Sequence, residues 1–499
     1  MKAFMSRLFT TKSGAVCALI YCATSCFYSQ VVLAQVTRDS LAEKFYTGPG
    51  MPAGSFITSP IQEPALLSGG DPLVQKGLYL ARAGDCIGCH SRPGGAPFAG
   101  GLPLKTPFGV IISTNITPSQ GNVGGLGNYT QAQFNHLMRD GINNNGYNIY
   151  PAMPYANYAR LSDDDLAALY AYFTRGMAPV VQTNAQTNLA WPFSMRWLVK
   201  GWNWLYLPKP GYTPDPGQNA QWNRGAYLVQ SLGHCGACHT PRNLAGAEKA
   251  SNEKGGKTFL AGALIDGWFA QNLRNTPDIN VGLNNWSQQD LVLYLKTGRS
   301  AHTAAFGAMA EVVGNSTQHM SLPDLSAVAV YLKSLGVLPA NQADAAGAVV
   351  AKGAAGKRLV EAQGQVSATS NAATHEPSSA ALRNHQANQP GALVYLNNCL
   401  GCHQSSGRGA NLAFPSLAQS STVAAPNTVS LIRIVLQGAN LPGTADAPSQ
   451  LAMPALAWRL SDADVADVLT FVRSSWGNRA PAVSAAEVAK VRKSLSASP

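Results

Sequence analysis

Several features that define common classes of protein are missing from this 499-residue sequence. Only 12% of the residues are charged, and no dense cluster of Lys or Arg occurs, so nucleic-acid binding gains no support. We find no P-loop, no G-x-G-x-x-G set in a strand–helix unit and no G-x-S-x-G nucleophile motif. Beyond the N-terminal segment, no apolar run reaches the roughly 18 residues that a membrane span needs. The sequence therefore offers no nucleotide site, no hydrolase site and no internal span.

Cysteine is scarce outside three short segments. Three of the nine cysteines lie within residues 1–34, where a basic start, an apolar run and a small residue at Ala34 predict a signal peptide. An uncleaved N-terminal anchor is the alternative. The other six all belong to C-x-x-C-H motifs, so none remains for a separate disulfide. An exported chain with six cysteines is usually stapled by disulfides, but this spacing indicates another use.

The three motifs predict covalent haem attachment. Two cysteines separated by two residues bring both sulfurs to one porphyrin edge, and the histidine that follows binds the iron. A single motif would also fit half a zinc site or a thioredoxin-like redox pair. Three copies, each with its own histidine and about 150 residues apart, favour haem. The predicted tethers are Cys86, Cys89, Cys235, Cys238, Cys399 and Cys402, and the predicted iron ligands are His90, His239 and His403.

An internal repeat predicts the second ligand of each iron. Residues 125–141 resemble residues 282–298 at a constant offset of 157. Applied to Met153, this offset falls next to Met309, so the repeat selects Met309 over Met320. Ligation by His and Met raises the potential of a haem, which suits electron transfer. The predicted axial methionines are Met153, Met309 and Met453, with His302 and His319 as alternatives at the second haem. We expect Met138, Met177 and Met195 in the core, and His136, His234, His375 and His385 on the surface.

The same segments carry signals for helix ends. Thr130 and Ser287 are predicted N-caps, and Gly141 and Gly298 are predicted C-terminal caps. After each axial methionine a Ser-x-x-Asp sequence precedes an apolar helix, which predicts a capping box. The predicted boxes pair Ser162 with Asp165, Ser321 with Asp324 and Ser461 with Asp464. A short helix before each haem motif carries a glycine and then Tyr79, Tyr227 or Tyr395.

This arrangement resembles three class I cytochrome c domains in series, a mainly α fold in which each tandem domain wraps round a covalent haem. The expected order is a signal peptide (1–34), domain 1 (65–185), an aromatic connecting segment (186–214), domain 2 (215–337), a low-complexity linker (338–388), domain 3 (389–478) and a polar tail (479–499). The formal net charge of +11 falls to +8 without the signal peptide. Six haem propionates would nearly neutralise the remainder, so most of the apparent basicity disappears in the haem-loaded chain.

The connecting segment contains "WPFSMRWLVKGWNWLYLPKP" at 191–210, which mixes six aromatic residues with Arg196, Lys200 and Lys209. Such a mixture is typical of a bilayer interface or of a partner surface. The alternative is that the segment packs as a bridge between the first two domains.

Four stretches carry a closer resemblance: "TPFGVIISTNITPS", "YPAMPY", "HCGACHTPRN" and "AFGAMAEVV". Over residues 70–478 the chain resembles the triheme cytochrome c subunit of membrane-bound bacterial dehydrogenases for alcohols, aldehydes, gluconate, sorbitol and fructose. The resemblance implies three haem c groups, with His90 and Met153, His239 and Met309, and His403 and Met453 as axial pairs.

The resemblance also implies partners and a location. A catalytic dehydrogenase subunit carrying pyrroloquinoline quinone, flavin or a molybdenum cofactor would oxidise the substrate, and a small extra subunit is expected. Electrons would pass to ubiquinone or a terminal oxidase, at the periplasmic face of the cytoplasmic membrane. The C-terminus "EVAKVRKSLSASP" has no hydrophobic anchor, so membrane contact would rest on an amphipathic tail, the aromatic segment or a partner.

Two other functions remain open from the sequence. A multihaem peroxidase or reductase would need one iron without its methionine. A haem-based sensor or a soluble shuttle would work outside any complex. On the leading hypothesis the chain has no catalytic residues of its own and transfers electrons for an oxidoreductase complex.

Overall fold

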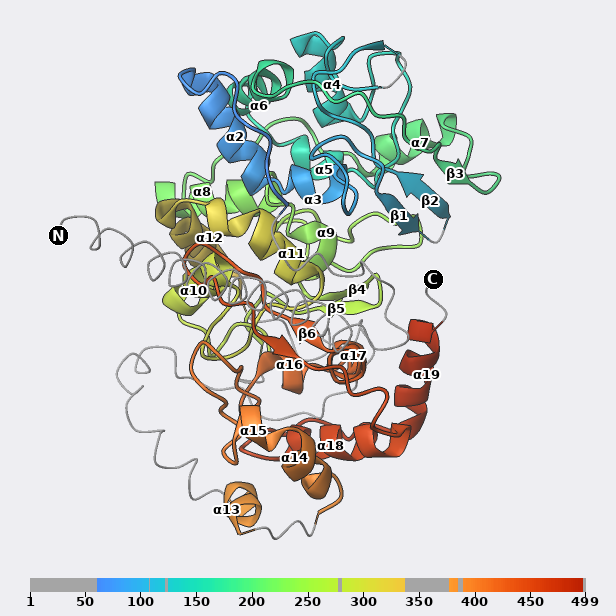
Figure 1. Cartoon of the computed structure of the whole chain (residues 1–499). Helices are drawn as coiled ribbons and strands as arrows, with labels where there is room; N and C mark the ends of the chain where they lie inside the picture. Colours follow the sequence, from blue (N-terminus) through green and yellow to red (C-terminus); the bar gives the residue numbers. More distant parts are fainter. Residues whose placement is uncertain are drawn as a thin grey trace, which may run out of the picture. The chain divides into compact units, whose positions relative to one another are not determined.

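A computed structural model describes residues 61–106, 108–121, 124–276, 281–336, 377–384 and 389–496. The signal peptide, most of the predicted linker, and His375 and His385 lie outside these residues. The described chain is mainly helical, with short antiparallel strand pairs (Figure 1).

The same crossing of two helices occurs three times. Helix α2 (Pro72–Ala83) packs on α6 (Asp163–Arg175), α8 (Ala220–Gln230) on α12 (Leu322–Ser334), and α14 (Ala392–Asn398) on α18 (Asp462–Ser474). A glycine lies at each crossing, where an added Cβ would come closer than 3.0 Å to a carbonyl oxygen of the facing helix. The glycines and the residues that own these oxygens are Gly77 and Ala168, Gly225 and Ala327, and Gly391 and Asp467. The glycine shared by the three predicted domains is therefore explained by close helix approach.

Each helix pair belongs to a region that contains further short helices and strands. The first region holds α3 (Cys86–His90), β1 (Pro103–Thr106), β2 (Gly109–Ile112), α4 (Gln131–Asp140), α5 (Tyr155–Tyr158) and β3 (Asn188–Leu189), with β2 between β1 and β3 in one antiparallel sheet. The second holds α9 (Gly236–His239), β4 (Ala263–Ile265), β5 (Trp268–Ala270), α10 (Gln288–Thr297), α11 (Ala308–Asn315) and η2 (Thr317–His319). The third holds α15 (Leu400–His403), α16 (Ser421–Ala424), α17 (Val429–Gln437), β6 (Ala439–Asn440) and β7 (Ala452–Met453). Helices α7 (Trp197–Tyr206), α13 (Pro377–Arg383) and α19 (Ala485–Ser496) lie outside these sets.

The predicted caps of the repeated helix are confirmed. Thr130 and Ser287 cap α4 and α10, each in a complete capping box. Gly141 and Gly298 end these helices with positive φ angles of 64° and 73°. Only glycine adopts this left-handed conformation without strain, so the turn that follows each helix depends on it.

The prediction of three further capping boxes is correct only for Ser461 and Asp464. Ser162 and Ser321 do cap α6 and α12, but their aspartates do not complete the box. Asp165 instead pairs with Lys76, and Asp324 pairs with Arg224, both at 2.7 Å. These ion pairs, together with tyrosines from the neighbouring region, occupy carboxylates that would otherwise reach back to the cap.

Regions 1 and 2 are joined by a reciprocal contact. Tyr227 donates from its hydroxyl to Asp165 at 2.6 Å, and Tyr79 donates to Asp324 at 2.5 Å. Each tyrosine hydroxyl also accepts a backbone N–H of the facing cap, from Ser162 in one case and from Ser321 in the other. Equivalent residues therefore exchange equivalent bonds, as in the interface of a symmetric dimer.

The hydrophobic cores reflect the pairing of regions 1 and 2. One apolar cluster includes residues of both regions, from Val74 and Leu80 to Leu325 and Tyr331. A separate cluster centred on Val465 and Phe471 belongs to the third region. Met138 and Met177 are buried as predicted, whereas Met195 is only partly buried.

Region 3 contacts region 2 through different elements. Ser430 on α17 accepts the backbone N–H of Phe269 on β5 at 2.7 Å. Arg433 on the same helix lies over the Trp268 ring, 4.3 Å from its centroid. Its Nη1 also donates to the carbonyl of Asp266 at 3.0 Å. The third region is thus held beside β5 rather than by the tyrosine exchange.

Two segments differ from their sequence interpretation. His234, expected on the surface, is partly buried, and its Nε2 lies 3.2 Å from the Gly84 carbonyl of region 1. The segment expected as a polar tail contains α19, which buries Val488 and Val491 against α17 and α18. The spacing of these two valines places both on one helix face, which explains why this charged segment still packs.

Candidate haem-binding sites

Each C-x-x-C-H motif forms a short helix directly after the first helix of its pair. Helices α3 and α15 end at His90 and His403, and α9 ends at His239. The six predicted tether cysteines are all free of disulfides. Both sulfurs and the imidazole of each motif are thereby placed within about one turn of chain, as haem attachment requires.

Each of the three motif histidines makes the same kind of hydrogen bond, from Nδ1 of its ring to a backbone carbonyl oxygen. Nδ1 of His90 lies 2.7 Å from the carbonyl oxygen of Thr114, Nδ1 of His239 lies 2.7 Å from that of Gln271, and Nδ1 of His403 lies 3.0 Å from that of Pro415. A carbonyl only accepts, so Nδ1 carries the proton and Nε2 keeps its lone pair. A hydrogen bond from Nδ1 to a carbonyl fixes the tautomer and the ring orientation of a histidine that binds metal through Nε2.

The electrostatic setting also keeps these rings neutral. Burial lowers the pKa of His90, His239 and His403, and the carbonyl contact only partly opposes this effect. A neutral imidazole is the form that binds a metal. The geometry and the protonation state therefore both suit Nε2 as an iron ligand.

The predicted methionines occupy three different local structures. Met153 lies in the turn before α5, Met309 is the second residue of α11, and Met453 ends β7. All three are partly buried, and Met153 and Met453 pack against the two apolar clusters. Met320, the rejected candidate, is a core residue with 6% exposure. Assignment of the three as axial ligands stays a prediction.

The alternative ligand His302 has other contacts. Its ring stacks on Trp286 with a centroid distance of 5.3 Å, and its Nε2 lies 3.3 Å from Asp290. One face of the ring and its Nε2 are thus engaged by residues outside the motif. His319 lies in η2, where burial lowers its pKa, and no contact of it points to the second motif.

The first and second motifs lie close together. Helix α11, which carries Met309, packs on α3 of the first motif. His234, directly before the second motif, lies 3.2 Å through its Nε2 from the carbonyl of Gly84, close before the first motif. The two predicted haem sites are therefore near one another.

The residues around the second motif fit a haem. Gln271, whose carbonyl holds His239, and Arg274 each have a buried donor without a hydrogen-bond partner in the described chain, Gln271 Nε2 and Arg274 Nε. The propionates of a haem would supply acceptors for these two donors. The described residues include no group of three His, Cys, Asp or Glu side chains arranged for a metal ion.

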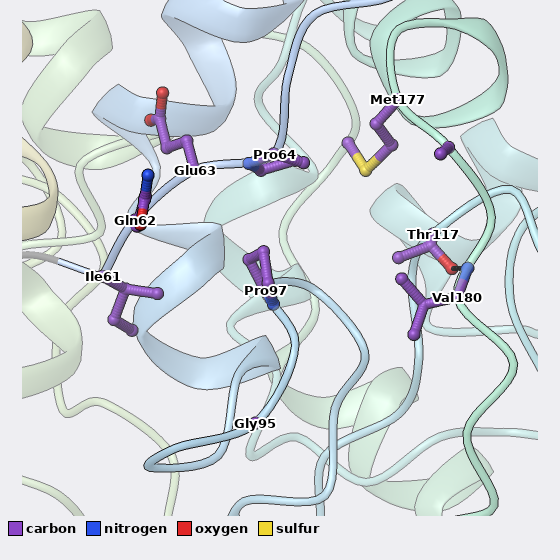
Figure 2. Close-up of a pocket in the computed structure, with 10 residues that line it drawn as sticks. Ile61, Gln62, Glu63, Pro64, Gly95, Pro97, Thr117, Met177 and Val180 are labelled. Atoms are coloured by element: carbon purple, nitrogen blue, oxygen red, sulfur yellow. Dashed lines mark hydrogen bonds between the residues drawn. The ribbon is translucent and has the colours of Figure 1, made fainter.

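A pocket of about 460 Å³ opens beside the loop that follows the first motif (Figure 2). Pro64, Pro97 and Met177 give it an apolar lining. Its carboxylate, Glu63, is occupied by Arg82, whose Nε donates to it at 2.8 Å. The pocket therefore presents no free reactive group.

Sequence reasoning missed the carbonyl acceptors and the tyrosine exchange. Any residue can supply a carbonyl, so Thr114, Gln271 and Pro415 carry no side-chain signal. Tyr79 and Tyr227 did recur with their glycines, and that recurrence was the available clue to a shared role.

Comparison with known proteins agrees with this geometry. The Cytochrome c family profile matches residues 389–476. The gluconate 2-dehydrogenase cytochrome c subunit of Pantoea cypripedii is 45% identical over 85% of this chain and 90% of its own length. The cytochrome c subunit of alcohol dehydrogenase (quinone) from Gluconobacter oxydans is 42% identical over 92% and 91%. The fructose dehydrogenase cytochrome subunit of Gluconobacter japonicus is 38% identical over 88% and 87%.

The motif geometry and these similarities define a c-type cytochrome. Within that class, the chain belongs to the family of the cytochrome c subunits of bacterial dehydrogenases. Membership implies electron transfer by covalently bound haem c and a catalytic dehydrogenase as partner.

Proposed function

We propose that this chain is a triheme electron-transfer subunit of a periplasmic dehydrogenase complex. It accepts electrons from a catalytic subunit that oxidises a sugar, an alcohol or an aldehyde, and it delivers them to ubiquinone or the respiratory chain. Three tandem cytochrome c domains, at 65–185, 215–337 and 389–478, each hold one haem. The complex lies at the outer face of the cytoplasmic membrane and includes a small extra subunit.

The observation that carries the proposal is the threefold recurrence of one arrangement. A glycine-mediated helix crossing, a C-x-x-C-H helix and an Nδ1 contact to a backbone carbonyl occur together at His90, His239 and His403. The profile match covers only the third of these regions. The identical support of all three histidines extends the same site to the first two.

The chain's residues have distinct roles in this proposal. A bound haem supplies the exchange of single electrons at its iron. The cysteine pairs would hold it covalently, the imidazoles, oriented by their carbonyl acceptors, would bind its iron, and the methionines would supply the other protein ligands. The buried clusters exclude water around the sites. The reciprocal interface keeps the first and second sites adjacent, which gives electrons a short path between them.

The partner and acceptor are supported by the relatives' names. They are cytochrome subunits of gluconate, alcohol and fructose dehydrogenases, and one name specifies a quinone. Because these partners oxidise different substrates, the cytochrome itself does not set the substrate. We place substrate chemistry in the catalytic subunit.

The test is purification of the tagged protein from solubilised membranes of its own cells, followed by haem quantification and identification of bound proteins. We expect three haems per chain and a co-purifying dehydrogenase whose substrate reduces them. A protein that purifies alone with three haems and reacts with peroxide would instead indicate a peroxidase, and fewer than three haems would refute the triheme assignment.

A further inference from the structure

Helix α7 of the aromatic connecting segment has two apolar faces, and only one of them is covered. Val199 is buried, and Trp202 and Asn203 are partly buried on the same side. On the other side Trp197, Trp204 and Leu205 are 67%, 85% and 62% exposed. Their spacing of seven and eight residues places them in one stripe along the helix. We call this stripe, with Lys200, the outer face.

The covered side fixes the helix in position. Asn203 accepts the hydroxyl of Tyr155 at 2.7 Å and donates to the carbonyl of Asp140 at 2.9 Å, both in region 1. The indole N–H of Trp202 donates to the carbonyl of Ala245 in region 2 at 3.0 Å. The outer face is therefore a fixed feature of the surface.

The charged residues within the connecting segment all have one sign. Residues 191–210 contain Arg196, Lys200 and Lys209 and no acidic residue. Arg196 lies over the Tyr150 ring, 5.0 Å from its centroid. Lys200 and Lys209 take part in none of the ion pairs found in the described ranges. Their charge is available to an anionic surface.

The other candidate for membrane contact is used inside the protein. The apolar residues of α19, Val488 and Val491, are 0% and 8% exposed. Arg492 holds this helix to Asp462 with a 2.7 Å ion pair. Across the described ranges, no helix is both long and apolar enough to span a bilayer. Of the two segments that the sequence suggests for membrane contact, the C-terminal tail and the aromatic segment, the aromatic segment is the one whose apolar side chains are exposed, on the outer face of α7.

We infer that the outer face of α7 lies in the headgroup region of an anionic bilayer. Tryptophan is enriched at membrane interfaces because its ring is apolar and its N–H is polar, and lysine draws the helix to anionic lipids. Lysine is depleted in protein–protein interfaces, so Lys200 within the stripe favours a lipid surface over a protein partner. The inference deepens the proposed function, on which it rests for the presence of a membrane.

The test uses the purified full-length holoprotein without any dehydrogenase. Sedimentation with phosphatidylcholine vesicles is compared with sedimentation with vesicles that also contain phosphatidylglycerol. We expect binding to the anionic vesicles that weakens with salt. Lys200→Gln should weaken it about fivefold, and Trp197→Ala with Trp204→Ala should weaken it at least about tenfold. Trp458→Ala is the matched control, since Trp458 is 76% exposed in region 3 and should leave binding unchanged.

Each contrary result has a defined meaning. Wild-type protein that ignores anionic vesicles, or a double tryptophan variant that binds them like the Trp458→Ala control, overturns the inference. Loss of the co-purifying dehydrogenase in the double variant, with vesicle binding intact, overturns it too and makes the outer face a protein interface. Unchanged haem spectra establish that the variants fold, and Lys200→Gln supplies a second test. Reduction of the haems by dehydrogenase in detergent is measured separately, so failure of the proposed function is distinguishable.

Discussion

Replacing Gly225 by alanine tests whether the helix crossing sets the architecture. A Cβ at this position would overlap the Ala327 carbonyl and come within 2.8 Å of the Tyr331 Cβ. Both obstacles belong to α12, and one is backbone, so no side-chain rotation relieves the overlap. The two helices must separate. Overpacking of this kind costs about 1–3 kcal/mol, and a backbone obstacle places the cost near about 3 kcal/mol.

The assay is thermal unfolding of the holoprotein, monitored by far-ultraviolet circular dichroism, and the haem content of each variant is measured beforehand. A loss of about 3 kcal/mol corresponds to a fall in Tm of roughly 6 °C or more for a region of this size. Gly201→Ala is the control, because no atom lies within 4 Å of a Cβ there. In an exposed helix this change should raise stability by about 0.5–1 kcal/mol. Equal Tm values for the Gly225→Ala and Gly201→Ala proteins would refute the packing argument.

Three other perturbations have defined outcomes. Changing both Tyr79 and Tyr227 to phenylalanine removes two charge-assisted bonds, each worth about 1.5–3 kcal/mol, and should lower the Tm of the first two regions while the third is unaffected in calorimetry. Met309→Ala should abolish the sulfur–iron absorption band of one ferric haem and lower the reduction potential of that haem. Met320→Ala should instead cost about 2–5 kcal/mol of stability and leave the spectrum unchanged. The reverse pattern would make Met320 the ligand. Burial raises the pKa of Asp290, but hydrogen bonds from His302 and Ser287 outweigh it and lower the pKa to about 2. The stability that the Asp290 carboxylate contributes is therefore present above its unfolded pKa near 3.8 and is lost as the pH falls from about 4 to about 2. Asp290→Asn should remove that acid-dependent part, about 1 kcal/mol after solvent screening, as measured by denaturant unfolding across that pH range.

Local sequence signals were reliable where both partners lie within one turn and no distant residue competes for either of them. Thr130 reaches Gln133, and Ser461 reaches Asp464, because the N-cap and the third residue of a helix are always adjacent. The same reasoning places two cysteines and a histidine on one short helix. These features need no knowledge of the rest of the chain, and the sequence therefore predicts them.

Signals that depend on distant residues were not predictable in the same way. Asp165 has the same local spacing as Asp464, yet Tyr227, 62 residues away, competes for its carboxylate. Burial first, and then the charge of Asp165, raise the pKa of Tyr227 to about 12, so its hydroxyl remains a donor. The competition depends on how two regions pack, and no local pattern records that.

Register explains why the third region does not repeat this interface. Tyr79 and Tyr227 follow their crossing glycines by two residues, whereas Tyr395 follows Gly391 by four. Two further residues turn a side chain about 200° round a helix. Tyr395 therefore faces inward, with 0% exposure, and donates to the Gln404 carbonyl at 2.7 Å.

This difference in register divides the molecule into a coupled pair and a separate third region. Regions 1 and 2 share one apolar cluster and exchange tyrosine–aspartate bonds, so we expect a change at either tyrosine to affect the packing around both predicted haem sites of this pair. Region 3 has its own cluster and meets region 2 through α17 and β5. Substitutions in that contact, such as Ser430→Ala, should alter the third site's relation to the pair without altering the pair itself. If electrons pass along the three predicted sites, the step between the first two lies within the shared cluster, whereas the step to the third crosses a different interface, to which Arg299 also contributes by donating to the carbonyls of Leu412 and Ser449.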